Sequence, residues 1–131
     1  MPAPPLYILL CSAEHEKIQM AAMMAAVAAV SERPVQVFVS MNAIFVFRRD
    51  AGDERYSGGK FSDLMKKKSA PDALQLFEQG KMLGDLTMLP CSMALDISEL
   101  EMDDFVDGLF DEPAGLTKFL SDAEAGQLIT L

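Results

Sequence analysis

The sequence has few of the residues on which several common functional sites depend. Its 131 residues contain two cysteines, Cys11 and Cys91, and one histidine, His15. No Cys-x-x-Cys pair occurs, and no cysteine and histidine have the spacing of a zinc site. A glycine-rich nucleotide fingerprint is also missing, since Ser57-Gly58-Gly59-Lys60 lacks Walker spacing. We therefore expect no metal and no organic cofactor.

Positive charge and long hydrophobic runs are scarce as well. Eleven Lys and Arg oppose 20 Asp and Glu, for a net charge of −9, which makes phosphate backbones and anionic lipids poor partners. The near-apolar stretch 20–30 is shorter than the roughly 20 residues of a membrane-spanning helix. Residues 1–5 lack the basic region of a signal peptide. We expect a cytoplasmic protein with free thiols that binds neither nucleic acid nor membranes.

Short apolar runs alternate with helical patterns along the chain. The run at residues 6–11 is continuously apolar rather than alternating, which is typical of a central parallel strand covered on both faces. Strands are predicted at residues 6–11, 35–39, 85–89 and 127–131, with a short one at 109–110. Helices are predicted at residues 14–31, 72–82, 98–106 and 113–123, with a short helical segment at 44–47. This rhythm predicts one domain over residues 1–131, an α/β fold built as a three-layer α/β/α sandwich with a mostly parallel sheet of about five strands.

Three local patterns carry further expectations. Residues at about 48–70 are polar and rich in glycine and charge, which predicts a loop insertion with at most a helical turn. The predicted helix 14–31 is apolar on nearly all sides, so its second face is expected to meet another subunit. Ser98 and Glu101 have capping-box spacing for the helix 98–106. His15, between Glu14 and Glu16, is expected to be solvated.

Cys91 is the strongest candidate for chemistry. It follows the predicted strand 85–89 and Pro90, at the sheet edge where ligands of parallel α/β proteins gather. A thiolate there, near the backbone amides of residues 92–94, could hold a sulfane sulfur as a persulfide. A buried, inert cysteine is the alternative. Cys11 ends the first strand and would lie near Cys91 if their two strands pair.

The segment Pro90-Cys91-Ser92-Met93-Ala94-Leu95-Asp96 resembles the cysteine motif of the DsrE/DsrF-like (TusD-like) family of sulfur-relay proteins. The family form is Cys-x-Met-x-Met-Asp; Met93 and Asp96 match it, and Leu95 replaces a methionine. Residues 38–42, 101–108 and 119–131 also resemble family segments, so the likeness covers nearly the whole chain, least well at residues 48–70.

The resemblance implies a DsrEFH-like fold, a homo-oligomer (trimer or hexamer), and sulfur carried on one cysteine, here Cys91. A small sulfur-carrier or rhodanese-type protein would be the donor. Cys11, Ser92, Met93 and Asp96 are possible auxiliary residues, with no chemistry assigned to Asp96. We therefore expect a sulfur carrier or sulfurtransferase without metal or organic cofactor. A non-catalytic oligomeric binding module and a small-ligand-binding α/β domain are the alternatives.

Overall fold

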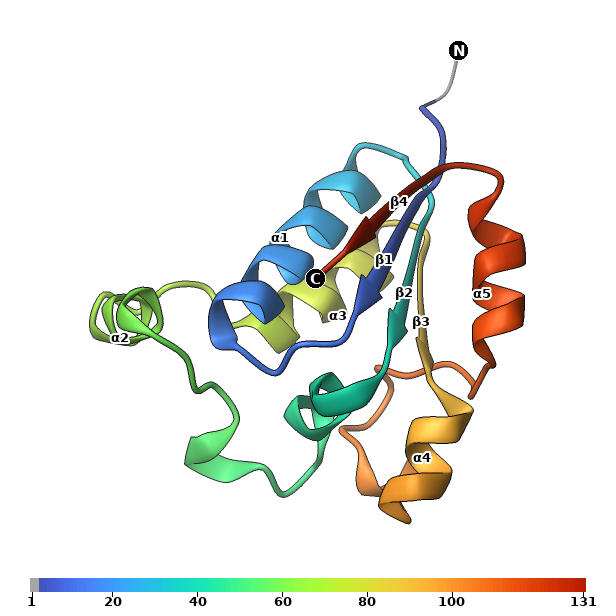
Figure 1. Cartoon of the computed structure of the whole chain (residues 1–131). Helices are drawn as coiled ribbons and strands as arrows, with labels where there is room; N and C mark the ends of the chain where they lie inside the picture. The colour runs from blue at the N-terminus through green and yellow to red at the C-terminus, as the bar shows by residue number, and fades with distance from the viewer. Residues whose placement is uncertain (1–2) are drawn as a thin grey trace.

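Four parallel strands form the central sheet, in the order β3-β2-β1-β4 (Figure 1). The structure, a computed structural model, describes residues 3–131. The strands are β1 (Leu6–Leu10), β2 (Val35–Val39), β3 (Leu86–Pro90) and β4 (Gln127–Thr130). All four coincide with predicted strands, and the parallel α/β fold is confirmed.

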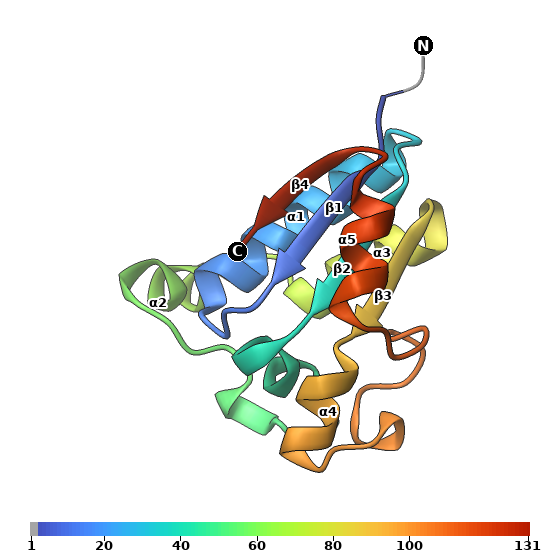
Figure 2. The same ribbon diagram turned by 45° about the vertical axis from the view of Figure 1, so that its right-hand side comes forward.

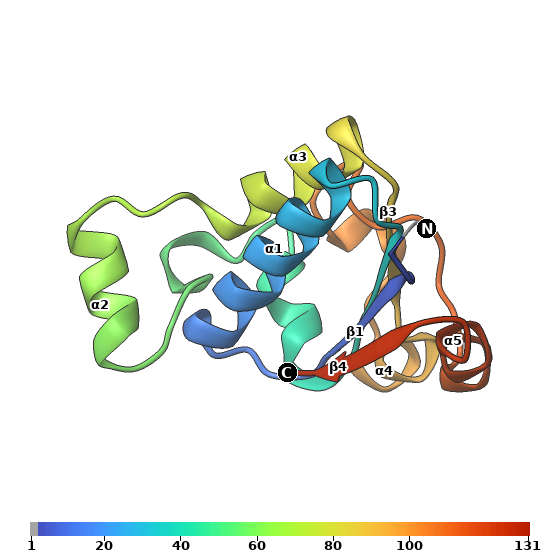
Figure 3. The same ribbon diagram turned by 90° about the horizontal axis from the view of Figure 1, so that it is seen from above.

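Helices cover the two faces of the sheet unequally. Figure 3 shows α1 (His15–Val30) and α3 (Ala73–Leu83) on one face and α5 (Leu116–Ala123) on the other. Gly84 follows α3, where an added Cβ would lie 2.4 Å from the carbonyl oxygen of Ala29, so only glycine allows this close approach to α1. Because helices lie on both faces, β1, β2 and β3 are buried along most of their length, as their largely apolar sequences predicted.

Several short elements gather at the carboxyl ends of the strands. The 3₁₀-helix η1 (Met41–Phe47) follows β2, and α4 (Ser92–Ser98) follows β3. Between η1 and α3, residues 48–70 contain η2 (Gly52–Glu54) and the two-turn helix α2 (Lys60–Lys67), which is longer than the single turn expected there. No helix among residues 3–131 is long and apolar enough to cross a membrane.

The strand predicted at residues 109–110 is absent from the described chain. Instead, Asp111 pairs with the free edge of β3 from both its backbone and its side chain. The N–H of Asp111 donates to the carbonyl oxygen of Met88 (2.8 Å). Its Oδ2 accepts the N–H of Met88 (2.7 Å) and forms an ion pair with Nζ of Lys81 (2.6 Å). One side chain therefore replaces a strand partner, so the sheet has four strands rather than about five.

The helix predicted at residues 98–106 is also wrong. Ser98 ends α4 instead of starting a helix, and its hydroxyl donates to the carbonyl oxygen of Ala94 (2.7 Å). Glu101 does cap an element, but its reciprocal partner is Asp104, and the element is the single turn η3 (Met102–Asp104). The last helix, α5, begins at Leu116 rather than at residue 113.

Candidate functional site

Cys91 is held in place by its backbone at the junction of β3 and α4. Its N–H donates to the carbonyl oxygen of Val39 (2.8 Å), which continues the β2–β3 ladder by one residue. Its carbonyl oxygen accepts the N–H of Leu95 (3.0 Å), which begins α4. The side chain is 5% exposed. Figure 2 shows α4 directly after the carboxyl end of β3, with α5 beside the strands.

A neighbouring segment fixes the other side of this junction. Ala114 forms an isolated parallel bridge with Cys91. The N–H of Ala114 donates to the carbonyl oxygen of Pro90 (3.0 Å), and its own carbonyl oxygen accepts the N–H of Ser92 (2.9 Å). The Ser92 amide is one of the three expected near the thiol, but its N–H is already hydrogen-bonded to Ala114 and is not free to bind a sulfur anion.

Cys11 occupies the corresponding position after β1. Its N–H donates to the carbonyl oxygen of Leu131 (2.8 Å), and its carbonyl oxygen accepts the N–H of Ala43 (3.2 Å). The thiol is free and half-buried. Burial, and then repulsion from the nearby Cys91 thiolate, raise the pKa of the Cys11 thiol above its usual value.

The two cysteine-bearing strands do not pair, because β2 lies between β1 and β3. Leu10 pairs with Val39, and Val39 with the residue before Cys91, so the next row across the sheet reads Cys11, Ser40, Cys91. Two strand spacings put the two cysteine Cα atoms about 10 Å apart. A disulfide needs about 4.4–6.8 Å between Cα atoms, so these thiols are neighbours across a row without being a disulfide pair.

Both thiols nevertheless line one cavity of about 260 Å³ at the carboxyl edge of the sheet, on the face that carries α5. Its walls come from the ends of β1, β2 and β3, the start of η1, and the first residues of α4 and α5. The lining residues are Leu9, Cys11, Phe38, Ser40, Met41, Cys91, Ser92, Met93, Gly115 and Leu116. None of these residues is charged.

The auxiliary residues suggested by the sequence divide into two groups. Ser92 and Met93 line the cavity, and Met93 is 49% exposed at its rim. Asp96 is exposed in the middle of α4 and does not line the cavity. Sequence reasoning missed Ser40 and Leu116 as lining residues. The position of Ser40 directly after β2 was the available signal, since it matches the positions of Cys11 and Cys91 after their strands.

His15 is buried rather than solvated, and its partners come from residues 48–70. It is 5% exposed, its ring stacks on Tyr56 (centroids 4.6 Å apart), and Nδ1 lies 2.7 Å from the Ser62 hydroxyl. The neighbouring Glu16 carboxylate accepts the N–H groups of Gly59 and Ser62, each at 2.9 Å. The start of α1 is thereby tied to this polar segment.

Replacing His15 with glutamine is expected to remove a pH dependence of stability. Burial, and then the Lys66 cation, lower the pKa of the His15 imidazole below 6.5 in the folded state. The unfolded chain therefore binds the proton first as the pH falls. The free energy of unfolding should drop as the pH falls from about 6.5 toward that lower pKa, by up to about 1.4 kcal/mol per pH unit, with no such loss above 6.5.

Urea unfolding of both proteins between about pH 7 and about pH 5 tests this expectation. The carboxyl of Glu16, whose pKa is lowered from 4.5 by hydrogen bonds from backbone amides, changes charge only below this range. Equal slopes for the parent protein and the His15→Gln variant would contradict the assigned role of His15.

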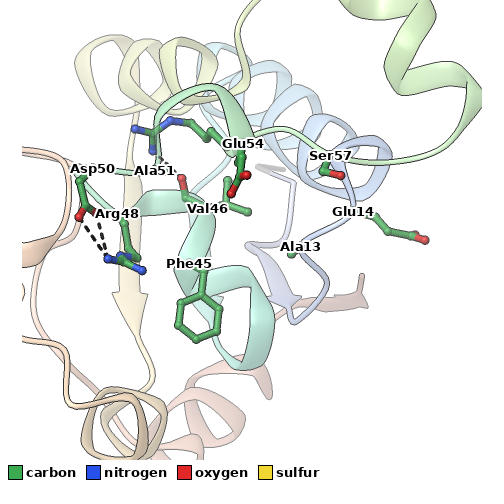
Figure 4. A pocket seen from close by; sticks show the side chains of 10 residues that line it. Ala13, Glu14, Phe45, Val46, Arg48, Asp50, Ala51, Glu54 and Ser57 are labelled. Atoms are coloured by element: carbon green, nitrogen blue, oxygen red, sulfur yellow. Dashed lines mark hydrogen bonds and ion pairs between the residues drawn. The ribbon is translucent and has the colours of Figure 1, made fainter.

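A second cavity, of about 440 Å³, lies between η1 and the start of α1 (Figure 4). Its lining contains charges of both signs, and Arg48 pairs with Asp50 at 3.1 Å. The guanidinium of Arg55 donates to the carbonyl oxygen of Val46 (2.5 Å). No cysteine lines this second cavity. Within residues 3–131, no group of three or more His, Cys, Asp or Glu side chains is arranged to hold a metal ion.

Comparisons with known proteins agree with this fold. No curated protein matches the chain. The solved structure of a protein of unknown function from Methanobacterium thermoautotrophicum matches this chain with a TM-score of 0.64. The match covers 97% of this chain and 98% of that one at 15% identity, so it supports the fold alone. The profile of the DsrE/DsrF/DrsH-like family matches residues 54–130, which include Cys91 but not Cys11. The chain belongs to the DsrE/DsrF/DrsH-like family.

Proposed function

We propose that the protein is a sulfur carrier that accepts sulfane sulfur as a persulfide on Cys91 and passes it to a partner thiol. The observation that supports this most directly is the position of Cys91 in the wall of the cavity at the carboxyl edge of the sheet. This cysteine lies within the part of the chain that matches the family, after a buried strand and before α4. The resemblance of residues 90–96 to a sulfur-relay motif points to the same residue.

The proposed cycle needs no metal and no organic cofactor. The Cys91 thiolate attacks the terminal sulfur of a donor persulfide, a new S–S bond forms, and the donor leaves as a thiolate. A partner thiolate then attacks the outer sulfur and restores Cys91. The donor in this proposal is a small sulfur-carrier or rhodanese-type protein, and the two free cysteines suit the reducing cytoplasm.

Replacing Cys91 with serine is expected to abolish loading at this position. The protein would be incubated with a persulfide donor, and intact mass spectrometry would count added sulfur atoms. The parent should gain the mass of at least one sulfur atom, and the Cys91→Ser variant should gain none. Cys11→Ser serves as the matched control, because it removes a thiol from the same cavity and should still load. Equal loading of the parent and the Cys91→Ser variant would exclude Cys91 as the acceptor.

The burial of Cys91 favours one other function, a non-catalytic binding module with an inert cysteine. At 5% exposure, the thiol can react only through the cavity. Alkylation of the folded protein separates the two functions. The carrier is expected to lose the Cys91 thiol at a rate well above that of global unfolding, whereas an inert cysteine would react only as the chain unfolds.

The same proposal includes self-association through the outer face of α1. This face carries four half-exposed or exposed apolar residues: Met20 (47%), Met23 (43%), Val27 (64%) and Val30 (55%). Met20, Met23 and Val27, together with the edge strand β4, border a largely apolar cavity of about 520 Å³. No charge lies between Ile18 and Val30. A continuous apolar surface of this kind is typical of an interface, and a second copy of the chain is the proposed occupant.

A further inference from the structure

The structure places a second thiol in the cavity of Cys91 that the proposed function leaves unused. We propose that Cys11 is a second sulfur-carrying residue, so that a sulfane sulfur received by Cys91 crosses the cavity to Cys11 and leaves from there. This inference rests on the proposed persulfide on Cys91. It assigns a role to a residue outside the part of the chain matched by the family profile.

The row Cys11, Ser40, Cys91 puts both cysteine side chains on one face of the sheet, in the wall of one cavity. A cysteine sulfur lies about 3 Å from its Cα, but side chains stand roughly perpendicular to a sheet, so sulfurs on Cα atoms about 10 Å apart lie about 6–7 Å from each other, and an outer sulfur on Cys91 spans about 2 Å of that distance. During transfer, the moving sulfur is partly bonded to both cysteine sulfurs. Two S–S separations of slightly more than about 2 Å each span about 4–5 Å, so the two cysteine side chains must approach each other by about 2 Å during the transfer.

The same spacing opposes the competing reaction. If the Cys11 thiolate attacked the inner sulfur of the persulfide, the two cysteines would form a disulfide and hydrosulfide would leave. That product needs Cα atoms about 4.4–6.8 Å apart, which the intervening strand β2 prevents. The fold therefore separates the thiols enough to keep the sulfur in its sulfane state and still within reach.

The transfer balances without any further reactant. The Cys11 thiolate attacks the outer sulfur of the Cys91 persulfide, a bond forms between Cys11 Sγ and that sulfur, and the bond to Cys91 Sγ breaks. The outer sulfur keeps its proton, and the electron pair of the broken bond stays on Cys91 as a thiolate. One persulfide is consumed and one is formed, so no oxidant or reductant is required.

Exposure and charge give the transfer its direction and its pH dependence. Cys91 is 5% exposed, whereas Cys11 is half-buried and easier for a partner thiol to reach. Burial raises the pKa of the Cys11 thiol, so only a small fraction of Cys11 is nucleophilic at neutral pH. Below that pKa, the transfer rate should rise about tenfold per pH unit, because the thiolate fraction does.

A time course of sulfur position tests the relay. The whole protein would be loaded briefly with glutathione persulfide, desalted, and alkylated at intervals, and the peptides containing Cys11 and Cys91 would be analysed by mass spectrometry. The extra sulfur should appear first on Cys91 and later on Cys11. The rate of sulfur transfer from Cys91 to Cys11 should be independent of protein concentration. Neither hydrosulfide nor a disulfide between the two cysteines should form. In Cys11→Ser the sulfur should stay on Cys91, and in Cys91→Ser the remaining thiol should stay unloaded over the same interval.

The outcomes separate the relay from the function on which it rests. Sulfur that loads Cys91 but never reaches Cys11 would overturn the relay and leave the carrier function intact. Loading of Cys11 in Cys91→Ser as fast as in the parent would also overturn the relay, because Cys11 would then take sulfur directly from the reagent. Failure of Cys91 to load in the parent would overturn the carrier function and the relay together.

Discussion

Replacing Phe119 with alanine is expected to lower the free energy of unfolding by about 3–5 kcal/mol. Phe119 is fully buried on the inner side of α5. Its ring stacks on Phe38 with centroids 5.1 Å apart and meets Tyr7 edge-on at 6.1 Å. Truncation removes these contacts and leaves a void under α5, which covers the centre of this face (Figure 3).

The adjacent residue offers a matched control. Leu120 is 45% exposed on the same helix, so Leu120→Ala should change stability by well under half of the Phe119→Ala effect. Denaturant unfolding of both variants gives the comparison. Because Phe38 also lines the cysteine cavity, Phe119→Ala should increase the alkylation rate of Cys91 as well. A stability loss no greater than that of Leu120→Ala would mean that α5 is not anchored by this ring.

The strands were the most predictable part of the fold. Residues 6–10 are continuously apolar and residues 35–39 are apolar except for Gln36, because helices cover both faces of β1 and β2, and this burial can be read directly from the sequence pattern. Helix α1 was equally predictable, because the helical pattern at residues 14–31 is long. Local signals were sufficient here because each element carries its own burial pattern.

The errors arose where a single polar side chain decides the structure. Residues 109–110 are apolar enough for a strand, but the carboxylate of Asp111 supplies the pairing with β3 instead. The sequence could not indicate that this carboxylate meets an edge strand, because β3 becomes an edge only through the strand order. Ser98 has the right spacing for a capping box, yet Cys91 has already started a helix that ends there.

The candidate site shows the same division between local and long-range information. The position of Cys91 after a buried strand was predictable, since strand ends are marked in the sequence. Its relation to Cys11 was not, because it depends on β2 lying between the two strands. His15 appeared solvated from its acidic neighbours, but Ser62, 47 residues away, buries it. Tertiary partners of this kind leave no periodic signal.

Replacing Val27 with aspartate is expected to dissociate the proposed oligomer. Val27 is 64% exposed at the centre of the apolar face of α1, so the folded subunit can accept a charge there. In an interface the carboxylate would be buried without a partner, at a cost of about 3 kcal/mol or more, which weakens association by about two orders of magnitude. Light scattering coupled to size exclusion should then report a monomer over a concentration range in which the parent is oligomeric.

Ile97→Asp is the appropriate control, because Ile97 is an exposed apolar residue (74%) on α4, outside the proposed interface. It should leave the oligomer intact. Equal unfolding midpoints for monomeric Val27→Asp and Ile97→Asp would indicate a subunit that is stable alone, whereas a lower midpoint for Val27→Asp would show that association contributes to stability. A parent protein that is already monomeric at micromolar concentration would contradict the proposed interface and leave the apolar face of α1 for a different partner.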